Sequence, residues 1–247
     1  REMLASHDWL TPRLNGVLYF EKPPLQYWMS AVSIKLFGHQ DWAARLPLAL
    51  AAALLLWCAW RLAKRLGSRR PIWAAAMAAT TILGFVVGQI LTLDALFSAL
   101  TVLTFVAAVE AVATEMAGGN PRKWLLLEFA ALALAFLTKG LAAAVLPGGA
   151  LLFSLFLAKG SPALRRAILR TLFDPLGWVL AAVLAAPWFV LVNRANPGHA
   201  WFFFMHEHFA RFLTPEAQRQ GSTNPLLDKL YFAGVLAVGL LPWLSAA

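Results

Sequence analysis

The stretch Asn15-Gly-Val-Leu-Tyr-Phe-Glu-Lys-Pro-Pro24 places an acidic and a basic side chain, Glu21 and Lys22, directly before two prolines. Proline fixes its own φ and biases the residue before it toward an extended backbone, so both charges are expected on a stiff, non-helical segment. Asn15-Gly16 predicts a turn just upstream. Two interpretations fit: a site at a membrane surface, or an interfacial loop whose aromatic and lysine side chains only anchor the protein.

The composition is that of a membrane protein. Of the 247 residues, 60% are hydrophobic and 13% are charged, whereas soluble domains carry about 25% charged residues. We therefore expect an all-α polytopic membrane protein. The single cysteine, Cys58, excludes disulfides and cysteine-rich metal sites. The net charge of +9 does not indicate nucleic-acid binding, because the basic residues fall between apolar runs rather than along one face.

Apolar runs divide the chain into an outer loop, a membrane region, a second outer loop and the start of a further span. The first outer loop covers 1–42 and includes an interfacial helix over 25–37 that ends at Gly38. Transmembrane helices occupy 43–192, with spans near 43–60, 71–88, 95–112, 124–138, 141–158 and 172–192, and Lys139-Gly140 as a tight turn. The second outer loop is 193–229, and 230–247 begins another span. Since the chain starts without Met and stops inside an apolar run, we expect a fragment of a longer protein.

The distribution of basic residues predicts the topology. Loops 61–70, 115–123 and 159–171 hold 11 of the 21 Lys and Arg residues, which makes that side cytoplasmic. The opposite side then gathers most of the unusual polar residues, namely Glu21, Lys22, Asp94, Lys139, His206, Glu207, His208 and Arg211.

Asp94, Lys139 and Arg211 are candidate site residues, each with a plainer alternative. A carboxylate between hydrophobic spans is costly unless it is paired or wetted, so Asp94 is a functional candidate or the N-cap of the following helix. Lys139 either neutralises a phosphate as a point charge or snorkels from a helix end. Arg211 offers a planar fork of donors that suits an anion.

The stretch 201–212 contains two histidines, His206 and His208, which lie too close in sequence to share a helix face. Together with Glu21 they offer nitrogen and oxygen ligands to a divalent metal, and three ligands with an open position would suit zinc. The alternative is a pair of interfacial histidines in an aromatic belt.

Further stretches complete a pattern: Arg1-Glu-Met-Leu-Ala-Ser6, Asp8-Trp-Leu-Thr-Pro-Arg-Leu-Asn-Gly16, Ala44-Arg-Leu-Pro47, Leu137-Thr-Lys-Gly140, Pro187-Trp188, Glu207-His208 and Leu241-Pro-Trp243. With Tyr19-Phe-Glu-Lys-Pro-Pro-Leu25, these resemble bacterial membrane glycosyltransferases of the aminoarabinose transferase type, relatives of protein O-mannosyltransferases. The resemblance implies a GT-C transmembrane helix bundle with periplasmic interfacial helices, in the bacterial inner membrane.

The resemblance also implies the chemistry. The donor would be a polyprenyl-phosphate sugar, and the acceptor would be lipid A or another glycolipid or a protein. Glu21 and a histidine of the 206–208 pair would bind metal, Lys22, Lys139 and Arg211 would contact phosphate, and Asp94 would line the cavity. The family's acidic pair would precede Arg1, and its soluble periplasmic domain would follow residue 247. Ala217-Gln-Arg-Gln220 departs from the family's usual Ala-Gln-His.

We expect direct displacement at the anomeric carbon with polyprenyl phosphate as the leaving group, aided by preorganised cations. Glu21, Lys22 and Asp94 are the catalytic candidates, with Asp94 as the base for a hydroxyl acceptor. A transporter or flippase is an alternative of a different class, but it would show internal repeats and ionisable residues near the bilayer midplane. A purely structural membrane subunit would leave Glu21 and Lys22 replaceable.

Overall fold

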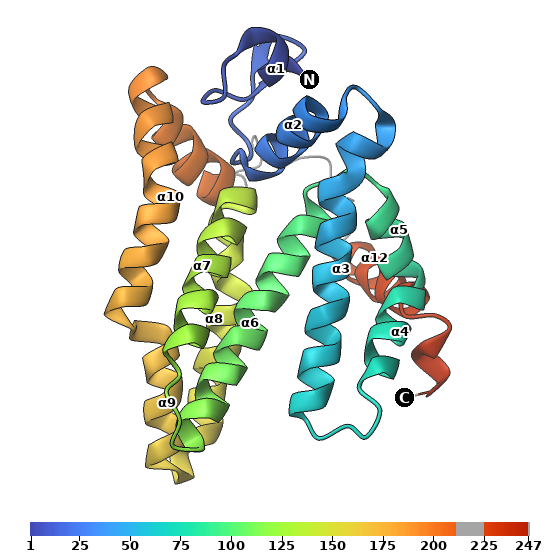
Figure 1. Cartoon of the computed structure of the whole chain (residues 1–247), viewed down its shortest axis with the longest axis vertical. Helices are drawn as coiled ribbons and strands as arrows, with labels where there is room; N and C mark the ends of the chain where they lie inside the picture. The colour runs from blue at the N-terminus through green and yellow to red at the C-terminus, as the bar shows by residue number, and fades with distance from the viewer. Residues whose placement is uncertain (211–224, 247) are drawn as a thin grey trace.

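The computed structural model describes residues 1–210 and 225–246 as a helical bundle with a short β-hairpin, which confirms the all-α polytopic fold class (Figure 1). The helices are α1 (Glu2–Ser6), α2 (Leu25–Phe37), α3 (Asp41–Arg65), α4 (Ile72–Thr80), α5 (Ile82–Gln89), α6 (Asp94–Met116), α7 (Arg122–Lys139), α8 (Ala142–Leu157), η1 (Ala158–Gly160), α9 (Pro162–Phe173), α10 (Pro175–Ala195), η2 (Trp201–Ala210), α12 (Pro225–Gly239) and η4 (Trp243–Ala246). The hairpin pairs β1 (Arg13–Leu14) with β2 (Val17–Leu18) in antiparallel register.

Helix α6 is the centre of the bundle. In its most apolar window 67% of the residues are buried, against 28% or less in the other candidate spans. Its small side chains Ala99 and Ala107 are fully buried, and they let α3 and α7 approach closely. A second core joins α7 to α10 through Phe129, Leu137 and Trp188.

The outer surface of the bundle is apolar. Phe153, Phe156 and Val183 are each more than 60% exposed on α8 and α10, which is expected where side chains face lipid rather than water. Among the described residues, the helices long and apolar enough to cross a membrane are Asp41–Arg65, Asp94–Met116, Ala142–Gly160 and Pro162–Ala195, with α4 and α5 as one further, bent span. The chain is therefore a multi-pass membrane protein.

The predicted span 71–88 is not one helix: α4 and α5 meet at a 68° bend. Thr81 has an extended backbone there, and its Oγ1 accepts a bond from Gly84 N at 3.1 Å, so it acts as the N-cap that starts α5. Residues near 240 form hydrogen bonds to the bend. Ile82 N donates to Leu241 O at 3.1 Å, and Trp243 Nε1 donates to Thr80 Oγ1 at 2.8 Å.

The predicted basic loop 159–171 is largely helix α9, and this expectation was wrong. Ser161 Oγ accepts from Leu164 N at 3.3 Å and Pro162 occupies the first turn, which together favour a helix start. Ala167 and Ile168 are buried on the inner face of α9. The helix periodicity was hidden because basic residues occupy the rest of its surface.

The three basic segments meet at one end of the bundle, opposite α1 and α2 (Figure 1). Several of their arginines pair with acids of neighbouring helices. Arg61 Nε lies 2.8 Å from Glu110 Oε1, and Arg65 also pairs with Glu110. Arg122 Nη1 lies 2.7 Å from Asp174 Oδ2, which also caps α10.

The topology is testable by cysteine labelling. We expect a cysteine at Ser6 to react with an impermeant maleimide in spheroplasts and one at Ser68 to stay unlabelled until the cells are lysed, both in a Cys58→Ala background. Cys58 is buried, so we expect it to react little with the maleimide, and its replacement removes any remaining label at that position. Labelling of Ser68→Cys alone in intact spheroplasts would reverse the assigned sides.

Candidate functional site

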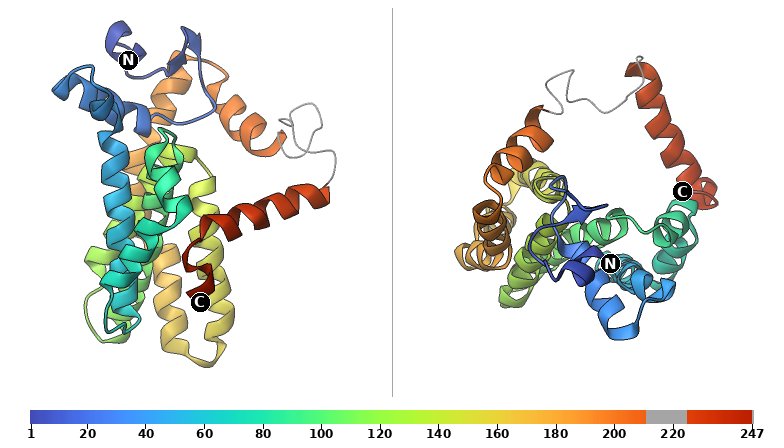
Figure 2. Two further views of the ribbon diagram at one scale, coloured as in Figure 1. Left: turned by 90° about the vertical axis from the view of Figure 1, so that its right-hand side faces the viewer. Right: turned by 90° about the horizontal axis from the view of Figure 1, so that it is seen from above.

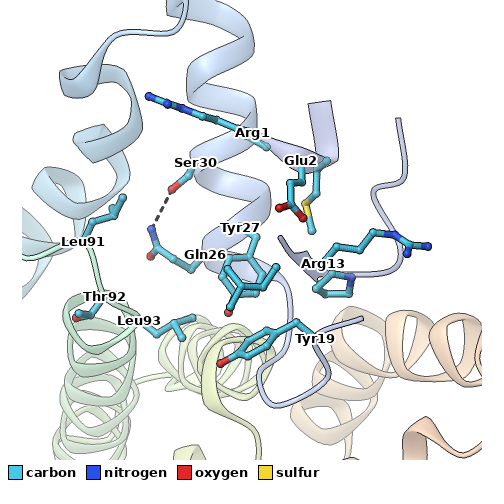
Figure 3. Close-up of a pocket in the computed structure, with 14 residues that line it drawn as sticks. Arg1, Glu2, Arg13, Tyr19, Gln26, Tyr27, Ser30, Leu91, Thr92 and Leu93 are labelled. Carbon is cyan, nitrogen blue, oxygen red and sulfur yellow. Dashed lines mark hydrogen bonds between the residues drawn. The ribbon is translucent and has the colours of Figure 1, made fainter. Parts of the chain in front are cut away.

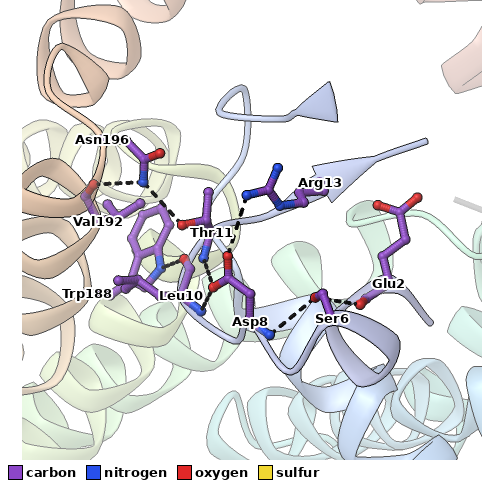
Figure 4. Close-up of polar contacts among 9 residues, drawn as sticks. All are labelled: Glu2, Ser6, Asp8, Leu10, Thr11, Arg13, Trp188, Val192 and Asn196. Atoms are coloured by element: carbon purple, nitrogen blue, oxygen red, sulfur yellow. Dashed lines mark hydrogen bonds and ion pairs between the residues drawn. The ribbon is translucent and has the colours of Figure 1, made fainter. Parts of the chain in front are cut away.

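The outer segment before Glu21 is anchored to the bundle by side-chain donors (Figure 4). Trp188 Nε1 on α10 donates to Leu10 O at 3.0 Å, and Asn196 Nδ2 donates to Thr11 Oγ1 at 3.1 Å. Asp8 Oδ1 accepts bonds from the backbone N–H groups of Leu10 and Thr11, both at 3.0 Å. The segment is thus held to a membrane helix that follows it by some 180 residues.

The hairpin reverses the chain toward the site. Asn15 and Gly16 both have positive φ, 53° and 77°, as a two-residue turn between paired strands requires. The turn predicted at Asn15-Gly16 is therefore confirmed. Tyr19 N then donates to Pro12 O at 2.9 Å, which fixes the approach to Glu21.

Glu21 and Lys22 lie on a non-helical segment just before α2, as predicted. Phe20 packs against the α7–α10 core and Pro23 is fully buried, so the backbone on both sides of the charged pair is held. Lys22 Nζ donates to Glu21 O at 3.0 Å and lies 3.7 Å from Glu207 Oε2 of η2. An ion pair between such distant parts of the chain favours a built site over an anchoring loop.

The stretch predicted as an outer loop at 201–210 is the π-helix η2, which lies over the turn between α7 and α8. Gly140 in that turn has φ +69°, and a Cβ there would lie 2.5 Å from Phe203 Cζ and 2.9 Å from His208 Nε2. Leu141 N donates to His208 Nε2 at 3.3 Å, while His208 Nδ1 lies 2.6 Å from Phe203 O. Both ring nitrogens of His208 therefore form hydrogen bonds, one within η2 and one that holds η2 against the turn between α7 and α8.

Asp94 and Lys139 form a second ion pair at the same end of the bundle. Asp94 is the first residue of α6, whose N-cap is Leu93 without a side-chain bond, so the N-cap interpretation was wrong. Lys139 also lies over the Phe97 ring, 5.1 Å from its centroid. Lys139 at the end of α7 thus contacts both Asp94 and Phe97 of α6.

Sequence reasoning assigned no role to Glu207 or His199. Glu207 has a side chain only 6% exposed, yet it pairs with Lys22 and lies 3.6 Å from His206 Nδ1. A lone acid within an aromatic run was the available signal. His199 is buried among aromatic rings including Phe20 and Trp188, and this burial lowers its pKa, so the imidazole is neutral. Arg211 lies outside the described residues.

The described residues do not assemble the predicted metal site. They contain no group of three or more His, Cys, Asp or Glu residues that could hold a metal ion. His208 is engaged on both nitrogens, which leaves Glu21 and His206 as candidate ligands, one fewer than a catalytic zinc site takes from the protein. The divalent metal stays a prediction, and no step below depends on it.

Metal analysis of the purified full-length protein tests that prediction. If metal binds here, we expect His206→Ala to lose it and His208→Ala, as the matched control, to retain it, because both ring nitrogens of His208 are hydrogen-bonded, to Leu141 and Phe203, whereas His206 Nδ1 has no hydrogen-bond partner among the described residues. Retention of metal by both variants would contradict a site at this pair, and so would loss only from His208→Ala.

An apolar groove of about 430 Å³ begins beside this site. Its walls come from α7, α8, α10 and η2, and include Phe136, Leu141, Ala185, Phe189 and Phe204. The groove reaches Leu141, two residues beyond Lys139. An apolar groove that ends close in the chain to a cation suits an amphiphile with an anionic head and a hydrocarbon tail.

Comparison with known proteins gives consistent matches. Residues 21–191 match the family described as dolichyl-phosphate-mannose-protein mannosyltransferase. Undecaprenyl phosphate-alpha-4-amino-4-deoxy-L-arabinose arabinosyl transferase 1 of Sodalis glossinidius is 33% identical over 251 residues, which is 99% of this chain and 42% of the relative. The corresponding transferase of Edwardsiella ictaluri is 32% identical, with 99% and 42% covered.

A solved structure agrees with these relatives. ArnT from Cupriavidus metallidurans bound to undecaprenyl phosphate superimposes with a TM-score of 0.83 at 32% identity, covering 98% of this chain and 42% of ArnT. Its apo form gives a TM-score of 0.78. This chain therefore spans about two-fifths of the length of these relatives, and it belongs to the dolichyl-phosphate-mannose-protein mannosyltransferase family.

Proposed function

We propose that the whole protein is a glycosyltransferase that moves 4-amino-4-deoxy-L-arabinose from undecaprenyl phosphate to lipid A. The reaction would take place on the periplasmic face of the bacterial inner membrane. One observation carries the proposal: two ion-paired lysines from distant segments, Lys22 and Lys139, lie at one end of the bundle, and an apolar groove reaches Leu141 at the same end. The names of the relatives, and the undecaprenyl phosphate bound to ArnT, support the choice of donor.

The lysines supply the main catalytic resource in this scheme. When the bond between the anomeric carbon and the phosphate oxygen breaks, negative charge grows on the departing polyprenyl phosphate. Lys22 and Lys139 neutralise that charge from fixed positions, and the apolar groove holds the tail so that the phosphate stays beside them. Arg211 would add a third cation to this set.

Each lysine is balanced by a carboxylate before the donor arrives. Glu207 pairs with Lys22 and Asp94 pairs with Lys139. Such pairs hold the ammonium groups in position before the phosphate arrives. A donor phosphate would then share each lysine with its acid, beside Glu21, whose Oε2 accepts a hydrogen bond from Tyr19 at 3.4 Å.

The acceptor decides whether a base is needed. A lipid A phosphate is already an anionic nucleophile and needs no proton removed. A hydroxyl acceptor on another glycolipid or a protein would need a carboxylate base, and Asp94 is the candidate among the described residues.

Reconstituted full-length protein tests the function directly. We expect transfer of aminoarabinose from its undecaprenyl phosphate donor to lipid A in proteoliposomes, and no transfer to a serine- and threonine-rich peptide. Transfer only to the peptide would replace the acceptor by a protein. Absence of transfer together with movement of the lipid donor between leaflets would favour a flippase and overturn the proposal.

A further inference from the structure

A second cavity, of about 510 Å³, lies on the outer side of the bundle, between the first outer segment, α2 and the residues just before α6 (Figure 3). Its lining includes Arg13, Tyr19, Gln26, Tyr27 and Thr92. Unlike the apolar groove formed by α7, α8, α10 and η2, this cavity combines apolar walls such as Met3 and Leu91 with several polar side chains. Such a lining suits a ligand with hydroxyl or amino groups.

Gln26 is the most informative residue in this cavity. It is only 4% exposed, yet its Oε1 has no hydrogen-bond partner among the described residues. Leaving a buried amide oxygen unpaired costs free energy, because its bond to water is lost and not replaced. A buried acceptor that lines a cavity is therefore expected to receive a donor from whatever occupies the cavity.

The orientation of the Gln26 amide follows from its neighbours. Ser30 Oγ donates to Ala44 O at 3.4 Å, so its proton is already committed. Ser30 Oγ therefore accepts from Gln26, whose Nε2 lies 3.2 Å away (Figure 3). With the amide nitrogen turned toward Ser30, the carbonyl oxygen remains as the group available to a ligand.

Two other side chains of the lining also favour a ligand with hydroxyl or amino groups. Glu2 also lines the cavity, and its Oε2 is buried without a partner among the described residues. Burial, together with the charges of Tyr19 and Glu21, raises the pKa of Tyr27 above its ordinary value, so Tyr27 keeps its O–H. Gln26, Glu2 and Tyr27 thus offer two acceptors and one hydroxyl, groups that can pair with the hydroxyls of a sugar ring.

The cavity adjoins the charged site. Tyr19 lines it and donates to Glu21 Oε2 at 3.4 Å. Leu93, which also lines the cavity, immediately precedes Asp94. A group held in this cavity would therefore lie beside both acidic candidates.

We propose that this cavity binds a glycosyl ring that bears hydroxyl or ammonium donors, with Gln26 Oε1 as a specificity-determining acceptor. The inference rests on the proposed function and names the part of the substrate that this cavity recognises. A hydrocarbon chain would leave Gln26 and Glu2 unsatisfied, and an ionised phosphate would have no proton to donate to either oxygen. The two arginines of the lining each lie beside an acid, Arg1 4.0 Å from Asp41 and Arg13 3.9 Å from Asp8.

Gln26→Leu in the full-length protein tests the proposal, because it removes the acceptor at nearly constant size. We expect KM for the undecaprenyl phosphate-linked sugar to rise about tenfold or more. Binding of sugar-free undecaprenyl phosphate, followed by quenching of tryptophan fluorescence, should stay within about twofold, since phosphate and tail bind elsewhere. Gln26→Glu keeps an acceptor oxygen at the same position and should recover part of the loss for an amino sugar.

The sugar in this cavity could belong to the donor or to the acceptor, and the kinetic constants distinguish the two. A higher KM for lipid A with an unchanged KM for the donor assigns the cavity to the sugar of the acceptor. If the wild type performs no transfer, binding of sugar-linked against sugar-free lipid still tests the cavity. Equal effects of Gln26→Leu on both lipids, or no effect on either substrate, would overturn the inference. Val32→Leu, on an exposed position of the same helix, is the control for folding.

Discussion

Lys22→Ala is expected to lower the rate of sugar transfer at least about a hundredfold, which corresponds to roughly 3 kcal/mol of lost transition-state stabilisation. Lys22 Nζ is held between Glu21 O at 3.0 Å and Glu207 at 3.7 Å, so its charge is in place before the phosphate arrives. Its loss removes a fixed cation and also leaves the buried carboxylate of Glu207 without this partner. Transfer should therefore fall in the chemical step as well as in donor binding.

Transfer from the lipid donor in proteoliposomes measures this effect, with separate determination of kcat and KM. Lys35→Ala is the matched control, because Lys35 is an exposed lysine on the neighbouring helix α2. It should retain wild-type rates. Lys22→Ala activity within about threefold of wild type, less than 1 kcal/mol of barrier, would remove Lys22 from the mechanism.

Gly140→Ala is expected to displace η2 and to reduce transfer by at least about tenfold. The backbone of Gly140, with φ 69° and ψ −140°, is in a region that costs other residues about 1–3 kcal/mol. The added Cβ would also lie 2.5 Å from Phe203 Cζ, which forces the helix that carries Glu207 to move. A displacement of about 1 Å in a catalytic group can cost about a hundredfold in rate.

Gly67→Ala separates backbone strain from the displacement of η2. Gly67 has φ +82°, but a Cβ there would meet nothing within 4 Å. We expect both variants to melt at a lower temperature than wild type, and only Gly140→Ala to lose transfer. Equal activity in the two variants would show that the contact between Gly140 and η2 has no part in the site.

Local rules predicted the parts of the fold that depend on a few adjacent residues. The turn at Asn15-Gly16, the helix ending at Gly38 and the break after Lys139 each follow from the backbone preference of a glycine or its neighbour. The charge pattern also placed Asp94 and Lys139 on the same side of the membrane. Their direct pairing required the structure, because it depends on how α6 packs on α7.

The remaining features depend on contacts between distant residues. Glu207 pairs with Lys22, which lies 185 residues earlier in the chain. No local sequence pattern predicts such a partner. The bend between α4 and α5 was missed because the apolar composition continues through Thr81. His206 and His208 look alike in sequence, but the bonds to Leu141 and Phe203 give His208 a structural role.

The bend at Thr81 also sets an order of events during synthesis. Ile82 N–H, at the start of α5, is satisfied by Leu241 O, which is made 159 residues later. At about 5–20 residues per second, that partner follows after roughly 8–30 s. Backbone groups without partners are costly in lipid, so α5 must wait for the end of this segment before it can settle at its final depth.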